Sequence, residues 1–362
     1  MRRHNVSVSA RASPAPAEPP LLEVRGLGVT LPTPRGPGHA LRDLSFTLER
    51  GATLGLIGES GCGKSMTALA LMGLLPAGAA VHGSIRLGGR ELVGLPDAAM
   101  CALRGDRIGM VFQEPMTALN PLHTVGAQIA EPLRLHRGLP REAARAEALR
   151  LLERVRMPQA ADRLGAYPHQ LSGGQRQRVT IAIALACGPD LLIADEPTTA
   201  LDATLQSEIL ALIAGLVRES GMALLLISHD LAVMARSVAR LLVMYGGTGV
   251  EAGPTAEVFA RLAHPYTRGL YAARPRLGGA RVDGRKARLA TIPGRVPDLA
   301  DLPPGCPFAD RCGWVIDACR RALPAPLPVG PGHTARCIRL GEIDEIDEID
   351  EIGEIGAIGA AA

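Results

Sequence analysis

The sequence predicts an α/β protein built around a mainly parallel sheet with both faces covered. Short apolar segments with the length of buried strands alternate with segments that have helical spacing. A glycine-rich loop, residues 58–65, lies between one such apolar segment and a good helix former. Another apolar segment, residues 191–194, runs directly into Asp195 and Glu196. Strands of a parallel sheet are buried on both faces, so helices are expected on each side.

The predicted elements follow one another in a regular order. The first two strands are expected at 22–31 and 40–48, with a Pro/Gly-rich loop at 32–38 between them. The remaining predicted strands are 54–57, short strands within 83–95, and 108–112, 191–194, 223–227 and 240–245. The predicted helices are 66–72, 172–186 and 202–219, the last ended by Gly221.

Changes in composition predict the domain organisation. Residues 124–165 are rich in Arg, Glu, Ala and Leu with apolar positions at helical spacing, which indicates a small helical insertion. Past about residue 255, Pro, Arg, Gly and Cys dominate, so we expect a small irregular extension. The predicted division is therefore a main domain at 21–255 with a helical subdomain at about 114–170, and an extension at 256–340.

Both ends of the chain have the composition of disordered segments. Residues 1–20 hold several Arg, Ser, Ala and Pro and lack the apolar core of a secretory signal. Residues 341–362 begin with a Glu-Ile-Asp repeat of period three, which keeps no steady stripe on a helix or a strand, and end in Gly and Ala. We expect both segments to be disordered.

Length, charge and cysteine usage exclude several classes. The 362 residues can bury a large core, and the net charge of +3 is too balanced to indicate a nucleic-acid partner or an anionic membrane surface. No apolar run approaches the roughly 18–20 residues of a spanning helix, so a role at a membrane would need a partner. Cys62, Cys101 and Cys187 are isolated, which fits a reducing compartment.

The glycine-rich loop has the pattern G-x-x-x-x-G-K-[ST]. Its residues are Gly58, Glu59, Ser60, Gly61, Cys62, Gly63, Lys64 and Ser65. In such a loop, backbone N–H groups and the positive end of the following helix face one anion. Lys64 suits the β- and γ-phosphates, and the Ser65 hydroxyl suits Mg²⁺. The loop predicts a nucleoside triphosphate site, and the alternative is a strand-to-helix turn that binds nothing.

Asp195 and Glu196 are the second chemical signal. Carboxylates at the end of an apolar strand are costly unless a cation or water uses them. Neighbouring strand residues point to opposite faces, so the two acids should have different tasks. Asp195 is the candidate Mg²⁺ partner, and Glu196 is the candidate base that polarises an attacking water. The alternative is a pair that caps the next turn.

A second anion cradle is predicted at the start of the 172–186 helix. Its residues are Ser172, Gly173, Gly174 and Gln175. Ser172 is a suitable N-cap, and the glycines expose backbone N–H groups beside a helix dipole. One nucleotide does not require two cradles in one chain.

Over residues 21–340 the chain resembles the ATP-binding subunits of ABC transporters. Residues 58–65 match the Walker A loop, 171–175 the signature sequence and 195–196 the Walker B carboxylates. Gln113 matches the Q-loop, Asp202 the D-loop and His229 the H-loop. The resemblance implies a P-loop ATPase that binds ATP and Mg²⁺, with Ser65, Gln113 and Asp195 near the metal.

The resemblance also implies a head-to-tail dimer, in which each ATP lies between Lys64 of one chain and Ser172 of the other. Glu196 would position the attacking water, His229 would hold the γ-phosphate and Gln113 would sense metal and water. The family usually stacks adenine on an aromatic residue before the Walker A strand. Leu31 occupies that place here, Phe46 is expected in the core, and His39 is an alternative partner.

Four further segments resemble importers: the first resembles peptide-importer ATPases, the second resembles importers in general, and the last two resemble the C-terminal extension of dipeptide, oligopeptide and nickel importers. They are residues 112–121, 167–170, 264–267 and 292–294. This subgroup implies a second ATPase subunit, identical or related, and two transmembrane permease subunits that dock near residues 113–135. A solute-binding protein would act indirectly, and the chain would lie peripherally on the cytoplasmic face of the inner membrane. The sequence does not name the solute; peptides are favoured, with nickel or another small solute as the alternative.

Two other functions are alternatives to an importer ATPase. A non-transport ABC ATPase, such as a DNA-repair or translation factor, would show long coiled coils or a duplicated cassette. A regulatory module without turnover would be expected to lack Glu196. The sequence therefore favours ATP hydrolysis coupled to import.

Four cysteines in the extension form a separate candidate site. Cys306, Cys312, Cys319 and Cys337 lack the close pair typical of structural zinc. Spacing is more variable in iron–sulfur sites, and some peptide importers carry a [4Fe–4S] cluster in this extension. The prediction is a cluster, with zinc or unbound thiols as alternatives.

Overall fold

The structure is a computed structural model that describes residues 19–199, 201–274, 281–282, 285–286 and 291–346. Among these residues the main sheet has eight strands in the order β13-β14-β10-β9-β3-β8-β7-β6. The five strands at one end are mutually parallel: β9 (Arg240–Tyr245), β3 (Thr53–Ile57), β8 (Ala223–Ile227), β7 (Leu191–Asp195) and β6 (Ile108–Val111). This parallel core confirms the predicted α/β class.

Three antiparallel strands extend the same sheet. They are β10 (Thr248–Pro254), β14 (His333–Ala335) and β13 (Leu327–Gly330). The sequence predicts none of these strands, and the expectation of only irregular structure after residue 255 is wrong. Each of these strands is short or glycine-containing, so its pattern is weak without its partners.

A second sheet is entirely antiparallel, in the order β2-β1-β4-β5. Its strands are β1 (Leu22–Thr33), β2 (Gly36–Leu48), β4 (Ala80–Leu87) and β5 (Arg90–Glu91). The loop predicted at 32–38 is wrong, because the strands continue to a two-residue turn at Pro34 and Arg35. Pro32 lies opposite Pro37. Alternate pairs of an antiparallel ladder need no N–H donor, so proline is tolerated there.

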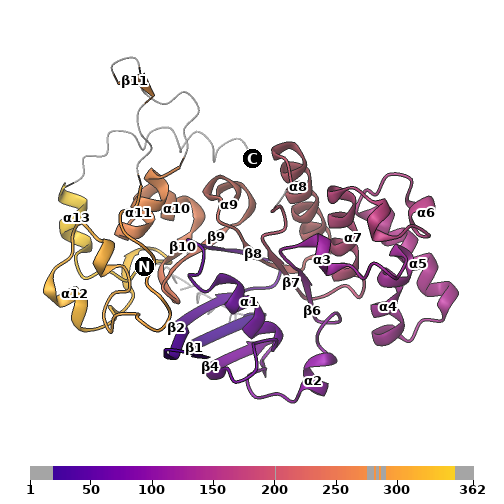
Figure 1. The fold of residues 1–362 in the computed structure, drawn as a ribbon, viewed down its shortest axis with the longest axis horizontal. Coiled ribbons are helices and arrows are strands. Elements are labelled where there is room, and N and C mark those ends of the chain that lie inside the picture. Colours follow the sequence, from indigo (N-terminus) through magenta and orange to yellow (C-terminus); the bar gives the residue numbers. More distant parts are fainter. Residues whose placement is uncertain (1–18, 200, 275–280, 283–284, 287–290, 347–362) are drawn as a thin grey trace, which may run out of the picture.

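The two faces of the main sheet are covered differently. On one face, helix α1 (Lys64–Met72) and the antiparallel sheet share a core with Leu191 and Ile193 of β7. On the other face, Leu192 and Ala194 pack in a core with the helices, among them α7 (Gly173–Leu185), α8 (Ala203–Ser220) and α9 (Leu231–Ser237). Figure 1 shows these layers. Helices therefore lie on both faces, as predicted, and the antiparallel sheet shares one face with α1.

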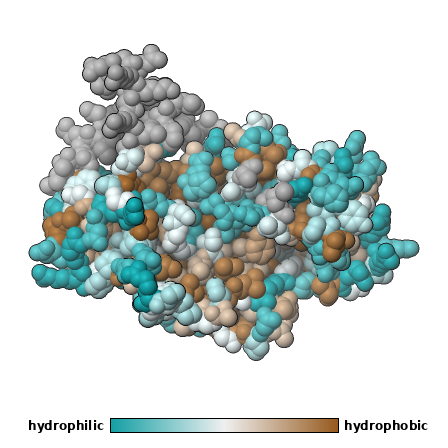
Figure 2. Space-filling model, viewed as in Figure 1, coloured by the Kyte–Doolittle hydropathy of each residue, from teal (hydrophilic) through white to brown (hydrophobic). Residues whose placement is uncertain are grey.

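A group of helices forms one end of the molecule (Figure 1). They are α3 (Pro115–Ala118), α4 (Val125–Arg137), α5 (Arg141–Arg154), α6 (Ala160–Arg163) and the 3₁₀ turn η1 (Pro168–Gln170). Helices α4 and α5 pack on each other and on α7. The helices predicted within 124–165 are confirmed, and in Figure 2 this end presents mainly hydrophilic side chains. The domain limits stay a prediction.

The C-terminal extension is tied to the main sheet by a buried carboxylate. Its elements are α10 (Thr255–Arg261), α11 (Pro265–Ala272), β11 (Arg281–Val282), β12 (Arg285–Lys286), η2 (Ala309–Arg311), α12 (Asp317–Arg321) and α13 (Leu340–Ile346). Glu251 of β10 accepts hydrogen bonds from the backbone N–H groups of Ala263 and His264 and pairs with His333 of β14. All of these groups are buried. Buried polar atoms need hydrogen-bond partners, and both oxygens of the Glu251 carboxylate have them.

Both predicted terminal segments lie largely outside the described residues. Residues 1–18 and 347–362 are not described. The expectation of a disordered tail from residue 341 is wrong for its start, where α13 continues to Ile346. Ile343 is fully buried, and this packing fixes the first turn of the repeat.

Candidate active site

The predicted site residues follow four adjacent strands at the carboxyl edge of the parallel sheet. The glycine-rich loop follows β3, His229 follows β8, the two carboxylates end β7, and Gln113 follows β6. Ligands of α/β proteins bind at this edge, outside the carboxyl ends of the strands. The sheet topology therefore brings together groups that are up to about 170 residues apart in the chain.

The glycine-rich loop passes directly into α1 without a side-chain cap. Gly63 has φ = 103°, and a Cβ placed on it would lie 2.9 Å from the carbonyl oxygen of Ala40. Only glycine fits this position, because both the backbone angle and the close approach exclude a side chain. The N–H groups at the start of α1 thus remain available for an anion.

Lys64 is folded back into the loop. Its Nζ donates to the carbonyl oxygens of Gly58, at 2.7 Å, and Glu59, at 3.0 Å. The residue is only 7% exposed. The ammonium group therefore lies within the loop, where a triphosphate would exchange with these carbonyls.

Asp195 fits a magnesium ligand. It is 4% exposed and forms a hydrogen bond with Ser65, while its Oδ1 is buried without a partner. Burial raises the pKa of this carboxyl, although the Ser65 hydrogen bond opposes the shift. A buried carboxylate oxygen with no partner beside a hydroxyl is a suitable donor set for Mg²⁺, which prefers oxygen ligands.

Glu196 faces a different set of partners from Asp195, as the strand alternation predicts. Its Oε2 accepts hydrogen bonds from Gln113 Nε2, at 3.3 Å, and from Thr199 Oγ1, at 2.9 Å. His229 Nδ1 lies 3.4 Å from Oε1. The structure therefore brings Gln113, Glu196 and His229 together, and it places Gln113 on Glu196 rather than on Asp195.

The backbone at Glu196 has an unusual conformation. Its φ is 46°, in the left-handed region, and its N–H donates to the carbonyl of Ile227 on β8 at 2.9 Å. Such a conformation is costly in a non-glycine residue and persists where the surrounding contacts fix it. Here it turns the carboxylate toward Gln113 and His229. Thr199 was not predicted, because a threonine after two acids carries no motif of its own.

The second cradle is formed but lies away from the glycine-rich loop. The Ser172 hydroxyl accepts from Gln175 N–H, at 3.3 Å, and Gln175 Oε1 accepts from Ser172 N–H, at 3.1 Å. This reciprocal capping box begins α7, and Ser172 and Gly173 are exposed. In Figure 1, β7, β6 and α3 lie between α1 and α7. Lys64 and Ser172 therefore begin helices that pack on different elements, α1 on β2 and β7, and α7 on β6 and α3.

Gly174 and Asp202 also have local structural roles. A Cβ on the buried Gly174 would lie 2.5 Å from the side chain of Leu205, so this glycine allows α7 to approach α8. Asp202 caps α8 and accepts from Leu205 N–H at 3.0 Å. Any role of Asp202 toward nucleotide stays a prediction.

No aromatic residue replaces the expected adenine platform in the first hairpin. Leu31 of β1 pairs with Gly38 of β2, and Phe46 packs against the core shared with α1. His39 is exposed and forms a hydrogen bond with Thr30 Oγ1 at 3.2 Å. The adenine-contacting residue stays open.

The four cysteines of the extension line one pocket, together with Phe308 and Trp314. Burial raises the pKa of Cys306 to about 12 and also raises the pKa values of Cys312 and Cys337, so the thiols are protonated at neutral pH. Within the described residues, no three His, Cys, Asp or Glu side chains are placed to hold a metal ion. The structure as it stands does not form the predicted iron–sulfur site.

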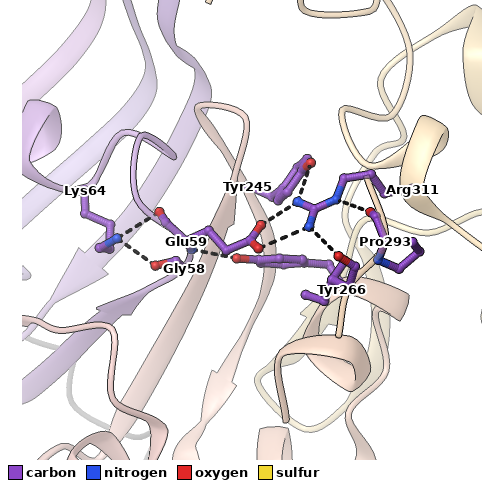
Figure 3. Close-up of polar contacts among 8 residues, drawn as sticks. Gly58, Glu59, Lys64, Tyr245, Tyr266, Pro293 and Arg311 are labelled. Atoms are coloured by element: carbon purple, nitrogen blue, oxygen red, sulfur yellow. Dashed lines mark hydrogen bonds and ion pairs between the residues drawn. The ribbon is translucent and has the colours of Figure 1, made fainter. Parts of the chain in front are cut away.

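Two residues that sequence reasoning missed contact the glycine-rich loop from the extension (Figure 3). Arg311 pairs with the carboxylate of Glu59, and the Tyr266 hydroxyl accepts from Glu59 N–H. Tyr266 lies in the segment 264–267, which resembled importers but gave no role. Nothing in the local sequence identifies Arg311.

A phosphate loop, a buried magnesium-type carboxylate and a second carboxylate beside a glutamine and a histidine define an ABC-type ATPase. Family models agree: residues 41–199 match the ABC transporter model, and residues 250–319 match the oligopeptide/dipeptide transporter C-terminal region. The chain belongs to the ATP-binding subunits of oligopeptide and dipeptide ABC importers.

Individual relatives support this assignment. The chain is 50% identical to the oligopeptide transport ATP-binding protein OppD of Haemophilus influenzae, over 84% of this chain and 92% of that protein. It is 47% identical to OppD of Salmonella typhimurium, over 92% and 98%. Among solved structures it resembles the ATP-binding cassette MJ0796, described as a dimer in a post-hydrolysis state bound to ADP and Pi. The TM-score is 0.59 and the identity 28%, over 65% of this chain and 98% of that one.

Proposed function

We propose that this chain is the motor subunit of a peptide importer and hydrolyses ATP in a head-to-tail dimer. The observation that carries the proposal is the separation of the two cradles. Lys64 lies in a nearly buried loop, whereas Ser172 and Gly173 are exposed at the start of α7. A complete phosphate site requires the Ser172 cradle of a second ATPase subunit. The dimeric state of MJ0796 supports this arrangement.

In the closed dimer, each residue of the site has a distinct task. Lys64 transfers its hydrogen bonds from the loop carbonyls to the phosphates. Glu196 accepts a proton from the attacking water, and its contacts with Gln113 and Thr199 fix its direction. His229, which is 68% exposed in the single chain, is free to reach the γ-phosphate. Mg²⁺ held by Ser65 and Asp195 would neutralise charge on the β- and γ-oxygens.

A groove between β6 and α4 is the proposed docking surface for the permease. Its lining includes Phe112, Glu131, Leu135 and His136. Phe112 is 42% exposed and Leu135 is 74% exposed. An apolar groove with a polar rim suits a short helix of a partner.

No helix of the described chain is long and apolar enough to cross a bilayer. In the proposed transporter, two permease subunits hold the chain at the cytoplasmic membrane face, and a solute-binding protein delivers peptide to them.

Mixing two inactive variants tests the shared site. Lys64→Ala and Ser172→Arg each disable both sites of a homodimer, but a mixed dimer contains one site with intact Lys64 and intact Ser172. Random pairing is therefore expected to restore about a quarter of the wild-type ATPase rate, because half of the dimers then hold one good site of two. Wild-type turnover by Ser172→Arg alone would contradict a shared site. An active wild type with no recovery on mixing would contradict a homodimer and favour a related second subunit.

Metal binding by the four cysteines of the extension is a separate proposal, independent of the ATPase mechanism. All four thiols line one pocket, and a metal bound there would have to displace the thiol protons and hold the cysteines as thiolates. Because the side chains as placed do not form a metal site, no step of the mechanism involves a cluster. Iron and sulfide analysis of protein purified without air decides between a cluster, zinc and free thiols.

A further inference from the structure

We propose that Arg311 and Tyr266 of the C-terminal extension are positioning residues for the phosphate loop, acting through Glu59. They fix the start of the loop and neutralise the one carboxylate within it. This inference rests on the ATPase function proposed above. It makes the extension part of the ATP site.

Arg311 and Glu59 form a two-pronged ion pair. Nη1 lies 2.6 Å from Oε2, and Nη2 lies 3.2 Å from Oε1. The side chain of Arg311 is 5% exposed and that of Glu59 is 28% exposed. Paired planar groups of this kind give orientation as well as attraction, and burial protects the pair from solvent screening.

The guanidinium group is itself held on its other sides (Figure 3). Nε donates to the carbonyl of Pro293, at 2.7 Å, and Nη2 also donates to the carbonyl of Ile292, at 3.2 Å. Nη1 donates to the hydroxyl of Tyr245, at 3.1 Å. With each nitrogen engaged, the direction of Arg311 is fixed before any nucleotide binds.

Tyr266 fixes the backbone of the same loop residue. Its hydroxyl accepts from Glu59 N–H at 2.7 Å, and the ring is fully buried against Tyr245 and Phe308. Glu59 is thus held at three points: its N–H by Tyr266, its carboxylate by Arg311 and its carbonyl by Lys64. Two of the three holding groups belong to the extension, more than 200 residues further along the chain.

The negative charge of Glu59 explains why the loop needs the contacts of Arg311 and Tyr266. Glu59 is the one acidic residue in the loop at 58–65, next to where the triphosphate binds. Without Arg311 its charge would repel the phosphates. A loop that is both neutralised and fixed pays less to bind ATP, which should appear in KM rather than in the chemical step.

The test compares Arg311→Gln, Glu59→Gln and the double variant in steady-state ATP hydrolysis. Arg311→Gln is expected to raise KM for ATP by about 10-fold, because the unpaired charge of Glu59 then repels the phosphates, with a smaller change in kcat. Adding Glu59→Gln removes the unpaired charge, so the double variant should have a lower KM than Arg311→Gln. A merely structural role would give no such recovery.

Arg320→Gln is the matched control, because Arg320 pairs with Asp310 on the exposed surface of the same extension. It is expected to leave KM unchanged. If Arg311→Gln does not fold, Arg311→Lys and Tyr266→Phe provide the test, since each removes one contact to Glu59 and should raise KM. Wild-type KM in the folded variants would overturn the inference while leaving the ATPase function intact. An inactive wild type would instead overturn the proposed function.

Discussion

Replacing Glu196 with glutamine is expected to stop ATP turnover and preserve ATP binding. Glu196 is the carboxylate that faces Gln113 and His229, whereas Asp195 is buried against Ser65. Glutamine has the same length, and its amide oxygen can still accept from the Thr199 hydroxyl. The exchange removes only the basic carboxylate. Loss of a general base lowers kcat about 10²- to 10⁴-fold, or about 3–5 kcal/mol in activation free energy.

Two measurements separate binding from hydrolysis. Phosphate release at saturating ATP gives kcat, and size-exclusion chromatography with ATP reports the dimer that cannot turn over. Glu208→Gln is the matched control, because this carboxylate pairs with Arg178 on the surface of α8. Its turnover is expected to equal that of the wild type.

A kcat for Glu196→Gln within tenfold of the wild type would refute the assignment of the base. An equal loss in Glu208→Gln would show that the effect is not specific to the site. Loss of ATP binding in Glu196→Gln would show that this residue supports the loop rather than the chemistry.

Three further changes test other parts of the structure. Burial raises the pKa of Asp195, so the folded chain holds this proton more tightly than the unfolded chain. Stability then falls as the pH rises from the pKa of Asp195 in the unfolded chain to its higher pKa in the folded chain. Asp195→Asn should therefore raise the Tm of the metal-free protein at pH 7, as measured by thermal denaturation. This gain in Tm should vanish below about pH 4, where the carboxyl is protonated in both states. Gly63→Ala combines a φ of 103° with a backbone clash, so a loss of about 1–3 kcal/mol in unfolding free energy and weak ATP binding are expected in denaturant and nucleotide titrations. Leu135→Glu places a charge in the exposed groove, and it should leave ATP hydrolysis by the isolated subunit unchanged but reduce peptide uptake by vesicles that contain the assembled transporter.

The parts of the molecule that could be predicted are those defined by local sequence. The strand before the phosphate loop, the loop itself and the acidic end of β7 each carry a pattern within about ten residues. The α7 capping box is equally local, since Ser172 and Gln175 satisfy each other. The sequence also indicated correctly that Asp195 and Glu196 would have different partners.

The unpredicted parts depend on distant contacts. Strands β13 and β14 form only because β10 offers an edge, and their own sequences hold too few apolar residues to indicate a strand. The Arg311–Glu59 pair joins residues 252 positions apart. Neither residue has a pattern around it that indicates the other, so only the folded chain shows that the extension contacts the loop.

The self-contained hydrogen bonding of Lys64 has a consequence for the transport cycle. With Gly58 and Glu59 as carbonyl acceptors, the empty loop keeps its shape between turnovers. On the proposed function, a nucleotide bound by Lys64 would replace these carbonyls as the acceptor, so the net gain in binding free energy would be smaller than the number of new contacts suggests. When the product nucleotide dissociates, Lys64 would bond to the two carbonyls again. An ATPase that must release its product in every cycle would benefit, because the empty loop regains these hydrogen bonds.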